Sequence, residues 1–276
     1  MLRDTPLTAA PLPALFVPHG APTFALRPGA AGAALAGIAG RLARPRAIVA
    51  VSAHWETDVP TVGLATRLET IHDFSGFPAE LYQMRYPATG CPEAAREVAQ
   101  AIAAADLPVD FDAHRGLDHG AWVPLRLMFP EADVPVVPLS IQPHRGPAHA
   151  LRVGRALAPL RERGILVIAS GNLTHNLRDY FVAAQTGGHT PPYVREFADW
   201  VWDRLEAGDV DALLDYRRAM PSAARAHPTE EHLLPLYVAL GAGGDAFTAE
   251  RVHAGIDDFV LAMDAFSFAS RHGAAA

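Results

Sequence analysis

The sequence predicts an α/β fold: a single domain with a central mixed sheet flanked by helices. Short apolar runs of β type alternate along the chain with longer segments of helical periodicity. The chain has 276 residues, half of them hydrophobic, which is enough for one large core. No internal repeat or low-complexity linker divides it. One domain spanning residues 1–276 is therefore expected.

Six apolar runs are expected to form strands. The run Ile48–Val51 is almost continuously apolar, as in a strand covered on both faces. The predicted strands are Ala14–Val17, Ala47–Ala53, Thr61–Ala65, Val134–Ile141, Gly164–Ser170 and Leu261–Phe268.

Five longer segments have helical periodicity. In one of them, Leu151, Leu157 and Leu160 are expected to face the sheet, and Pro159 predicts a kink or an early end. A Gly/Ala-rich run at 31–40 is expected to form a loosely specified helix, and the tail "RHGAAA" is expected to fray. The predicted helices are Pro92–Ala105, Ala121–Phe129, Pro147–Arg163, Pro191–Ala207 and Val210–Met220.

Composition excludes several classes of protein. A formal charge of −7 does not indicate a nucleic-acid binder. The single cysteine, Cys91, rules out an internal disulfide and a thiolate metal cluster, and it fits a reducing compartment. No run approaches the roughly 20 apolar residues of a membrane span, and the N-terminal segment lacks the apolar core of a signal peptide. A cytoplasmic protein with no membrane or nucleic-acid partner is expected, while the oligomeric state stays open.

Three predicted strands end in polar residues. "ALFVPHGAP" ends at His19, "AIVAVSAHWE" at His54, and "ILVIASGNLTHNL" delivers His175 between Asn172 and Asn176. A lone histidine is more often structural than functional. Ligands of open α/β sheets, however, bind outside the carboxyl ends of the strands. We therefore expect these three imidazoles to converge on an active site at that edge of the sheet, with the two asparagines holding the ring of His175.

His119 lies between Asp118 and Gly120, just before a predicted helix. One interpretation makes Asp118 the N-cap and places His119 in the first turn. The other places the imidazole on a loop beside an acidic neighbour, available for chemistry. The local residues support both.

The segment "AHPTEEHLLPLYVAL" contains His227 and His232. Pro235 belongs in the first turn of a helix, so the helix should begin near Glu231 or His232 and place His232 at the mouth of a cavity. The alternative is that Thr229 and Glu230 cap the helix and both histidines are exposed. For His72 neither a surface position nor a role in the site is chosen from its local residues. Surface positions are expected for His114, His144, His149, His189, His253 and His272.

Imidazoles with nearby carboxylates and no thiolates suit Fe, Zn or Cu better than Mg or Ca. A Zn hydrolase would keep one open metal position and a non-haem Fe(II) oxygenase several, and residue spacing does not choose between them. The chain lacks HExxH, GxSxG, P-loop and GxGxxG motifs. Zincin protease, α/β-hydrolase, NTPase and dinucleotide-binding functions therefore lose their usual support.

Taken in order, the motifs resemble those of the class III extradiol ring-cleaving dioxygenases, in particular the DOPA-dioxygenase-like (LigB-type) group. The resemblance runs from about residue 14 to residue 268 and implies that the chain is a single catalytic domain. Fold and family do not by themselves fix the substrate. The motifs are "ALFVPHGAP", "AIVAVSAHWE", "IHDFSGFPAELYQMRYPATGCP", "LDHGAWVPL", "VPLSIQ", "ILVIASGNLTHNLR" and "HPTEEHLLPLYVALGA".

The resemblance implies roles for particular histidines. His19, His54 and His232 would ligate the metal, with His227 a weaker candidate than His232. His175 would be the base beside the metal and also a possible ligand, and His119 would contact the substrate. Many class III enzymes use a glutamate as third ligand where this chain offers His232. Glu231 or Glu56 is then expected to supply a carboxylate behind the ligands.

The implied reaction is ring cleavage of a catechol, DOPA-like or related, by O₂ to a semialdehyde. Fe(II) would be the working metal, with Zn(II) present in purified protein. His175 would take a phenolic proton, and the segment His72–Tyr82 would supply substrate contacts through His72, Phe74 and Phe77. Two alternatives stay open: a metal-holding, Memo-like binding protein that cleaves no ring, and a Zn-dependent hydrolase.

Overall fold

The computed structural model of the protein describes residues 11–271. Its centre is a mixed sheet of eight strands in the order β4-β3-β5-β2-β6-β1-β10-β7, and a two-stranded hairpin joins β8 to β9. The strands are β1 (Ala14–Pro18), β2 (Ala47–Glu56), β3 (Thr61–Gly63), β4 (Asp110–Asp112), β5 (Val136–Ile141), β6 (Ile165–Gly171), β7 (Phe247–His253), β8 (Ile256–Asp257), β9 (Leu261–Ala262) and β10 (Ala265–Ser270).

The middle of the sheet is parallel. β2 and β1 flank β6, and all three strands run in the same direction. Antiparallel pairs lie toward both edges, where β3 pairs with β5 and β10 pairs with β1 and β7. Because neighbouring parallel strands end at the same edge, the residues that follow β1, β2 and β6 meet there.

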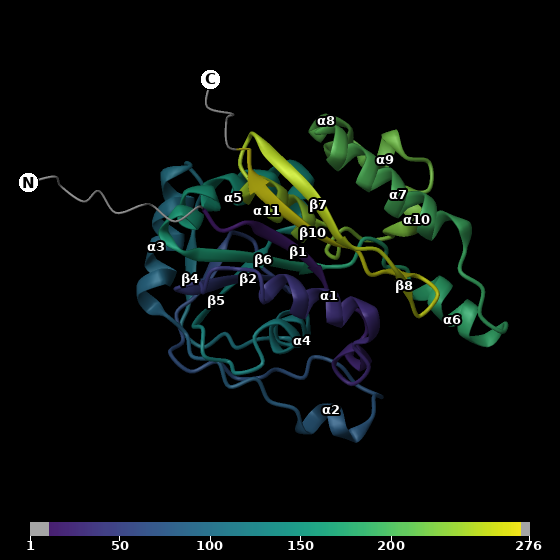
Figure 1. The fold of residues 1–276 in the computed structure, drawn as a ribbon, viewed down its shortest axis with the longest axis horizontal. Coiled ribbons are helices and arrows are strands. Elements are labelled where there is room, and N and C mark those ends of the chain that lie inside the picture. The colour runs from purple at the N-terminus through teal and green to yellow at the C-terminus, as the bar shows by residue number, and fades with distance from the viewer. Residues whose placement is uncertain (1–10, 272–276) are drawn as a thin grey trace, which may run out of the picture.

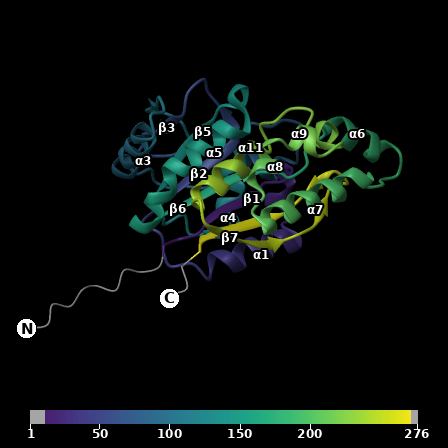
Figure 2. The ribbon, with the colours of Figure 1, turned by 90° about the horizontal axis from the view of Figure 1, so that it is seen from above.

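Helices cover both faces of this sheet. α5 and α11 lie over one face, and α1 and α4 lie over the other (Figures 1 and 2). Helices α6 to α10 and the β8–β9 hairpin extend beyond one end of the sheet (Figure 1). The helices are α1 (Gly29–Ala39), α2 (Ala79–Gln83), α3 (Pro92–Ala104), α4 (His119–Met128), α5 (Gly146–Leu157), α6 (Leu177–Gln185), α7 (Pro192–Ala207), α8 (Val210–Leu214), α9 (Tyr216–Ala219), α10 (Ala223–Ala226) and α11 (Leu234–Ala242).

The α5–α11 contact depends on two glycines. A Cβ on Gly154 would lie 2.2 Å from the carbonyl oxygen of Val238, and one on Gly241 would lie 2.3 Å from that of Leu151. The two backbones therefore approach more closely than any side chain allows. This close contact seats α11, and with it the segment that precedes α11, against the sheet.

The α/β class and the mixed sheet are confirmed, but several elements were not predicted, among them β4, β7 and α6, and others differ at their boundaries. The predicted strand 134–141 begins only at Val136. The predicted strand 164–170 begins at Ile165, because Gly164 has a φ of +76° and ends the preceding 3₁₀ helix. Pro159 has the expected effect: α5 ends at Leu157 and continues as a 3₁₀ helix to Arg163.

Two predicted elements are each divided in two. The expected strand 261–268 is split into β9 and β10 at Asp264, a buried carboxylate that accepts from Arg251. The expected helix 210–220 is broken at Asp215 into α8 and α9. The tail beyond Arg271, with His272, lies outside the described residues.

Candidate metal centre

Five imidazoles line one cavity of about 850 Å³. His19 follows β1, His54 lies near the end of β2, and His175 lies between β6 and α6. His119 is the first residue of α4, and His232 precedes α11. The structure therefore brings the three strand-end histidines together at the carboxyl edge of the sheet, as the sequence predicted.

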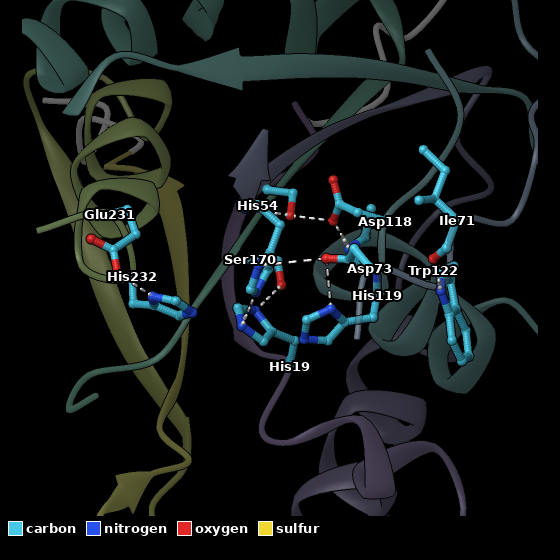
Figure 3. A network of polar contacts seen from close by, with 12 residues as sticks. His19, His54, Ile71, Asp73, Asp118, His119, Trp122, Ser170, Glu231 and His232 are labelled. Atoms are coloured by element: carbon cyan, nitrogen blue, oxygen red, sulfur yellow. Dashed lines mark hydrogen bonds and ion pairs between the residues drawn. The ribbon is translucent and has the colours of Figure 1, made fainter. Parts of the chain in front are cut away.

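His19 and His54 form the centre of the cluster. Their Nε2 atoms lie 3.2 Å apart, while Nδ1 of His19 lies 3.0 Å from Oγ of Ser170 (Figure 3). The Gly20 N–H donates to Oδ1 of Asn172, which turns the amide nitrogen of Asn172 toward Nε2 of His19 at 3.4 Å. A donor at Nε2 favours the tautomer of His19 in which this nitrogen is unprotonated, and a metal bound there would replace the contact with Asn172.

His232 faces His19 and His54 from the other side of the cluster (Figure 3). Its ring centre lies 5.3 Å from that of His19 and 5.0 Å from that of His54. Nδ1 of His232 lies 2.9 Å from Oε1 of Glu231, so its Nε2 is the free nitrogen. His175 stacks on His232 with ring centres 3.5 Å apart and an interplanar angle of 7°.

Asp73 holds His119 in place by two contacts. The sequence patterns did not predict Asp73 as a residue of the site. One carboxylate oxygen of Asp73 accepts from the His119 backbone N–H at 2.8 Å, and the other lies 2.9 Å from Nδ1 of His119. The second oxygen also lies 3.5 Å from Nδ1 of His54. Burial alone would raise the pKa of Asp73, but the hydrogen bonds from His119 outweigh it and lower this pKa to about 2.

Both interpretations of His119 describe part of the structure. Asp118 caps α4 by accepting from the N–H of Ala121, and His119 is in the first turn. His119 nevertheless faces the cavity, and its acidic partner is Asp73 rather than its sequence neighbour. The carboxylate of Asp118 binds Ser52 and Arg115 instead.

Four imidazoles of the cluster, those of His19, His54, His175 and His232, are neutral at pH 7. Burial, reinforced by His119, lowers the pKa of His54 to about 4, and burial is also the main reason that the pKa of His175 is about 4. Burial and the surrounding imidazoles lower the pKa of His19 and His232 well below the ordinary value. Neutral imidazole is the form that ligates metals.

The donor set fits a borderline metal such as Fe(II) or Zn(II). His19, His54 and His232 each turn Nδ1 toward an oxygen, which leaves Nε2 as the ligand atom, as is usual for metal-binding histidines. Two groups of side chains offer ligand atoms within 4.8 Å of one another: His19, His54 and His119, and His175, Glu231 and His232. His119 therefore competes with His232 for the place of third ligand.

The aromatic wall of the cavity includes two of the three predicted substrate contacts. Phe74 and Phe77 line it, and Phe74 lies 5.7 Å from the ring of His119. His72 stands behind this wall. Its Nε2 lies 3.1 Å from the Met84 carbonyl oxygen and its ring 5.7 Å from that of Phe74, so it supports Phe74 and does not line the cavity.

Two residues beside His54 differ in environment. Trp55 is buried and lies under the guanidinium of Arg115 at 5.0 Å, away from the cavity lining. Glu56 is exposed, and partial burial together with Glu231 raises its pKa. Of the two carboxylates expected behind the ligands, Glu231 contacts a histidine of the cluster, namely His232. The charge of Glu231 acts on Glu56 and raises its pKa.

Three expectations about nearby residues need correction. Asn172 binds His19, and Asn176 caps α6, so these asparagines do not hold the ring of His175 as expected. His227 and His232 are both buried, which rules out the exposed alternative. α11 begins at Leu234, two residues after His232 and slightly later than predicted.

His227 and the other histidines between residues 11 and 271, apart from those of the cluster, lie outside the cavity lining. Nε2 of His227 is 2.7 Å from the Leu173 carbonyl oxygen and its ring packs on Phe197. His114, His144 and His189 are exposed as expected, whereas His149 and His253 are half-buried.

Comparisons with known proteins agree on one family. The family described as "Catalytic LigB subunit of aromatic ring-opening dioxygenase" matches residues 32–258. A protein of Beta vulgaris named 4,5-DOPA dioxygenase extradiol is 41% identical over 228 residues, covering 82% of this chain and 84% of that protein. A protein of Escherichia coli K12 with the same name is 38% identical over 246 residues, covering 88% and 89%.

A solved structure extends the likeness to the fold. The crystal structure of an uncharacterized protein from Escherichia coli K12 superimposes with a TM-score of 0.76 at 32% identity. The match covers 93% of this chain and 99% of that one.

Proposed function

The chain belongs to the LigB family of aromatic ring-opening dioxygenases and is a metal-dependent extradiol dioxygenase, and from this premise we propose that it cleaves a DOPA-like catechol with O₂ to a semialdehyde. One observation carries the proposal: neutral imidazoles gather in a cavity that Phe74 and Phe77 wall on one side. Such a cavity suits a flat apolar ring with two oxygens at one edge.

The proposed ligands are His19, His54 and His232, with His175 a possible fourth. Their Nε2 atoms would hold Fe(II) in the working enzyme, and Zn(II) would occupy the same nitrogens in purified protein. When bound, Fe(II) would bring the two diol oxygens and dioxygen together for reaction. Ser170, Asp73 and Glu231 would fix the three rings from behind.

His175 is proposed as the general base. Its imidazole is neutral at pH 7, because burial lowers its pKa to about 4, so it can accept a proton from a catechol hydroxyl. The stacking of His175 on His232 holds its ring beside the proposed ligands. The transferred proton would thus stay within the cavity, on a nitrogen next to the reacting oxygens.

His119 is proposed to contact the substrate. Asp73 receives the Nδ1–H of His119, which leaves Nε2 for the substrate oxygen. If His119 gains a proton during the reaction, the carboxylate of Asp73 stabilises the resulting imidazolium, as in other His–Asp pairs. His119 can then return that proton to an oxygen of the opening ring.

We also infer that one domain, residues 1–276, contains the whole site and works in the cytoplasm on a small aromatic diol and O₂. No helix within residues 11–271 is long and apolar enough to cross a membrane. The low net charge density of the chain gives no reason to expect a nucleic-acid partner.

Anaerobic reconstitution with Fe(II) tests the function. The loaded protein is mixed with a panel of catechols, and O₂ is then admitted while absorbance and oxygen uptake are followed. We expect a yellow semialdehyde that forms only with oxygen. Turnover without oxygen would indicate the hydrolase alternative, and catechol binding without turnover would indicate a Memo-like binding protein.

A further inference from the structure

The segment that carries His175 belongs to no helix or strand. It runs from the end of β6 at Gly171 to the start of α6 at Leu177. Its backbone gains no hydrogen bonds from a ladder or a helical turn, so other parts of the chain must supply them. We call residues 172–176 the base segment, because they carry the proposed general base. The position of the His175 ring depends on the contacts of this backbone.

One side of the base segment is bound to the β8–β9 hairpin. Oγ1 of Thr174 donates to the Val260 carbonyl oxygen at 2.6 Å and accepts from the Ala262 N–H at 2.8 Å. Thr174 is buried, so water does not compete for these hydrogen bonds. They fix the segment one residue before His175, and the opposite side needs contacts of its own.

The opposite side is bound to α10 and to the residue after it, His227. The His175 N–H donates to the Ala226 carbonyl oxygen at 2.9 Å. Nε2 of His227 lies 2.7 Å from the Leu173 carbonyl oxygen and carries the proton of this hydrogen bond, because a carbonyl only accepts. Both hydrogen bonds join the same two stretches of chain, so together they fix the backbone on either side of Thr174.

The ring of His227 has this one hydrogen bond. It is fully buried and packs on Phe197 with ring centres 5.6 Å apart. Between residues 11 and 271 its Nδ1 has no hydrogen-bond partner. A buried acceptor without a partner costs stability, which offsets much of the gain from the hydrogen bond at Nε2. The contact with Leu173 therefore adds little net stability, and its main consequence is the position of the base segment.

The backbone of His227 is held as well. Its carbonyl oxygen accepts from Nη2 of Arg217 at 3.0 Å, and Nε of Arg217 donates to Oε1 of Glu230 at 2.8 Å. The hydroxyl of Tyr216 donates to the same oxygen of Glu230 at 2.8 Å. The donor at Nε2 of His227 thus belongs to a residue whose main chain has fixed contacts.

We propose that His227 is a positioning residue for the general base: by donating to Leu173, it holds the backbone of His175 so that the imidazole of His175 meets the catechol hydroxyl. His227 lies outside the cavity lining, so it acts only through the base segment. The proposal rests on the proposed function, in which His175 takes the phenolic proton.

A displaced base should slow proton transfer without weakening binding. A misplacement of about 1 Å can cost about 10²-fold in rate. His19 and His54 lie at the ends of β1 and β2, away from the base segment, so the metal should stay bound. Phe74 and Phe77 should likewise keep their contacts with the ring of a catechol. Loss of the donor is therefore expected to lower kcat and to leave KM unchanged.

Three substitutions of His227 test the proposal. His227→Leu is similar in size and has no donor. His227→Gln places an amide nitrogen as far along the side chain as Nε2, so it can still donate to Leu173, whereas the amide of His227→Asn is one bond shorter and does not reach. His149→Leu is the matched control, because it also removes a hydrogen bond of a histidine Nε2, here with Gln142, outside the cavity.

The hold on the segment and the activity are measured separately. Hydrogen exchange of the His175 amide is followed by NMR on Zn(II)-loaded protein, without catechol. Metal content, kcat and KM for L-DOPA are measured on Fe(II)-loaded protein. His227→Leu and His227→Asn should speed the exchange about tenfold or more and lower kcat roughly 10- to 100-fold, with KM and metal content unchanged. His227→Gln should restore exchange and kcat to within about threefold of the unmodified protein, and His149→Leu should change neither.

Several results would overturn the proposal. Exchange at His175 could be unchanged in His227→Leu, or it could rise equally throughout the chain, which would indicate general destabilisation. Faster exchange with unchanged kcat would also overturn it, as would metal loss that matches the fall in kcat, or a glutamine variant as slow as the leucine variant. Should His227→Leu not fold, the comparison of His227→Asn with His227→Gln decides by the same criteria.

Failure of the proposed function gives a different result. In that case the unmodified protein cleaves no catechol under oxygen. Exchange of the His175 amide still depends on whether residue 227 offers a donor, because that contact exists without substrate.

Discussion

At the scale of single residues, the oxygen behind each imidazole matters as much as the imidazole. Ser170, Asp73 and Glu231 each face an Nδ1 atom and thereby turn an Nε2 atom toward the cavity. Neutral rings with their lone pairs directed inward are suited to a metal and to proton transfer, and burial keeps them neutral.

The proposed base gives the first prediction at this scale. His175→Ala should retain the metal but lower the rate of ring cleavage by roughly 10²–10⁴-fold, the usual contribution of general base catalysis. Metal content by plasma emission and turnover of L-DOPA are measured together. His54→Ala should lose the metal, and the exposed His144→Ala should change neither. Equal metal loss in the His175 and His54 variants would make His175 chiefly a ligand.

The identity of the third ligand is a separate prediction. We expect His232→Ala to lose most of the bound metal and His119→Ala to keep it while turnover falls. The close grouping of His119 with His19 and His54 is the reason for measuring both variants. Metal loss confined to His119→Ala would assign the third ligand to His119 and leave His232 outside the metal site.

Residue patterns could predict the histidines but not all of their partners. His19, His54 and His175 follow buried strands, and this placement alone indicates the edge of the sheet where they meet. Asp73 gave no such signal, because its partner His119 lies 46 residues further along the chain. Its contact depends on how the loop before α2 folds back over α4, which no local pattern specifies.

At the scale of elements, close helix packing positions part of the site. Gly154 of α5 and Gly241 of α11 let the two helices touch at the backbone, and α11 begins just after His232. Any side chain added at this contact must push α11 outward. Such a shift would also move His232 relative to the strand-end histidines.

Gly154→Ala should therefore destabilise the protein by about 1–3 kcal/mol, the usual cost of overpacking. Gly37→Ala in α1 is the matched control. It is exposed, a Cβ there meets nothing within 4 Å, and the change should stabilise the helix by about 0.5–1 kcal/mol. Denaturant unfolding of both variants gives the comparison, and equal stability of the two would contradict the packing argument.

Among the element boundaries at proline and glycine, the early end of α5 at Pro159 was predicted correctly. The strands β5 and β6 begin at Val136 and Ile165, two residues and one residue later than predicted. α6 was missed because its apolar residues do not face the core: Leu177 and Phe181 are 54% and 57% exposed at the cavity wall. Periodicity detects burial against a core, so a helix whose apolar side lines a binding cavity escapes it.

At the scale of the whole molecule, the sheet order joins distant parts of the chain. β2, β6 and β1 are neighbours, so residues near 19, 54 and 175 meet although up to about 150 positions separate them. The fold class and the edge that holds the site followed from the alternation of strands and helices. The antiparallel pairing of β10 with β1 and of β7 with β10 could not be predicted in this way, because it depends on long-range packing.

Buried histidines should make the metal-free protein sensitive to acid. The pKa of His227 in the folded protein is lowered to about 4, chiefly by burial. Between pH 6.5 and pH 4, His227 therefore binds a proton in the unfolded chain but not in the folded one. The free energy of unfolding should fall as pH drops from 6.5 toward 4. His227→Gln should reduce the loss between pH 7 and pH 4.5 by roughly 2 kcal/mol. Denaturant unfolding at the two pH values measures it, and an unchanged loss would contradict the assignment.

The central claim is that this fold holds a metal at its histidine cluster and uses it to insert oxygen into a catechol ring. The most direct test supplies ¹⁸O₂ to the Fe(II)-reconstituted protein with L-DOPA and analyses the product by mass spectrometry. Both labelled oxygens should appear in the semialdehyde, and the His54→Ala variant should give no product. A product that forms without consuming O₂, or one that carries no label from it, would contradict the claim.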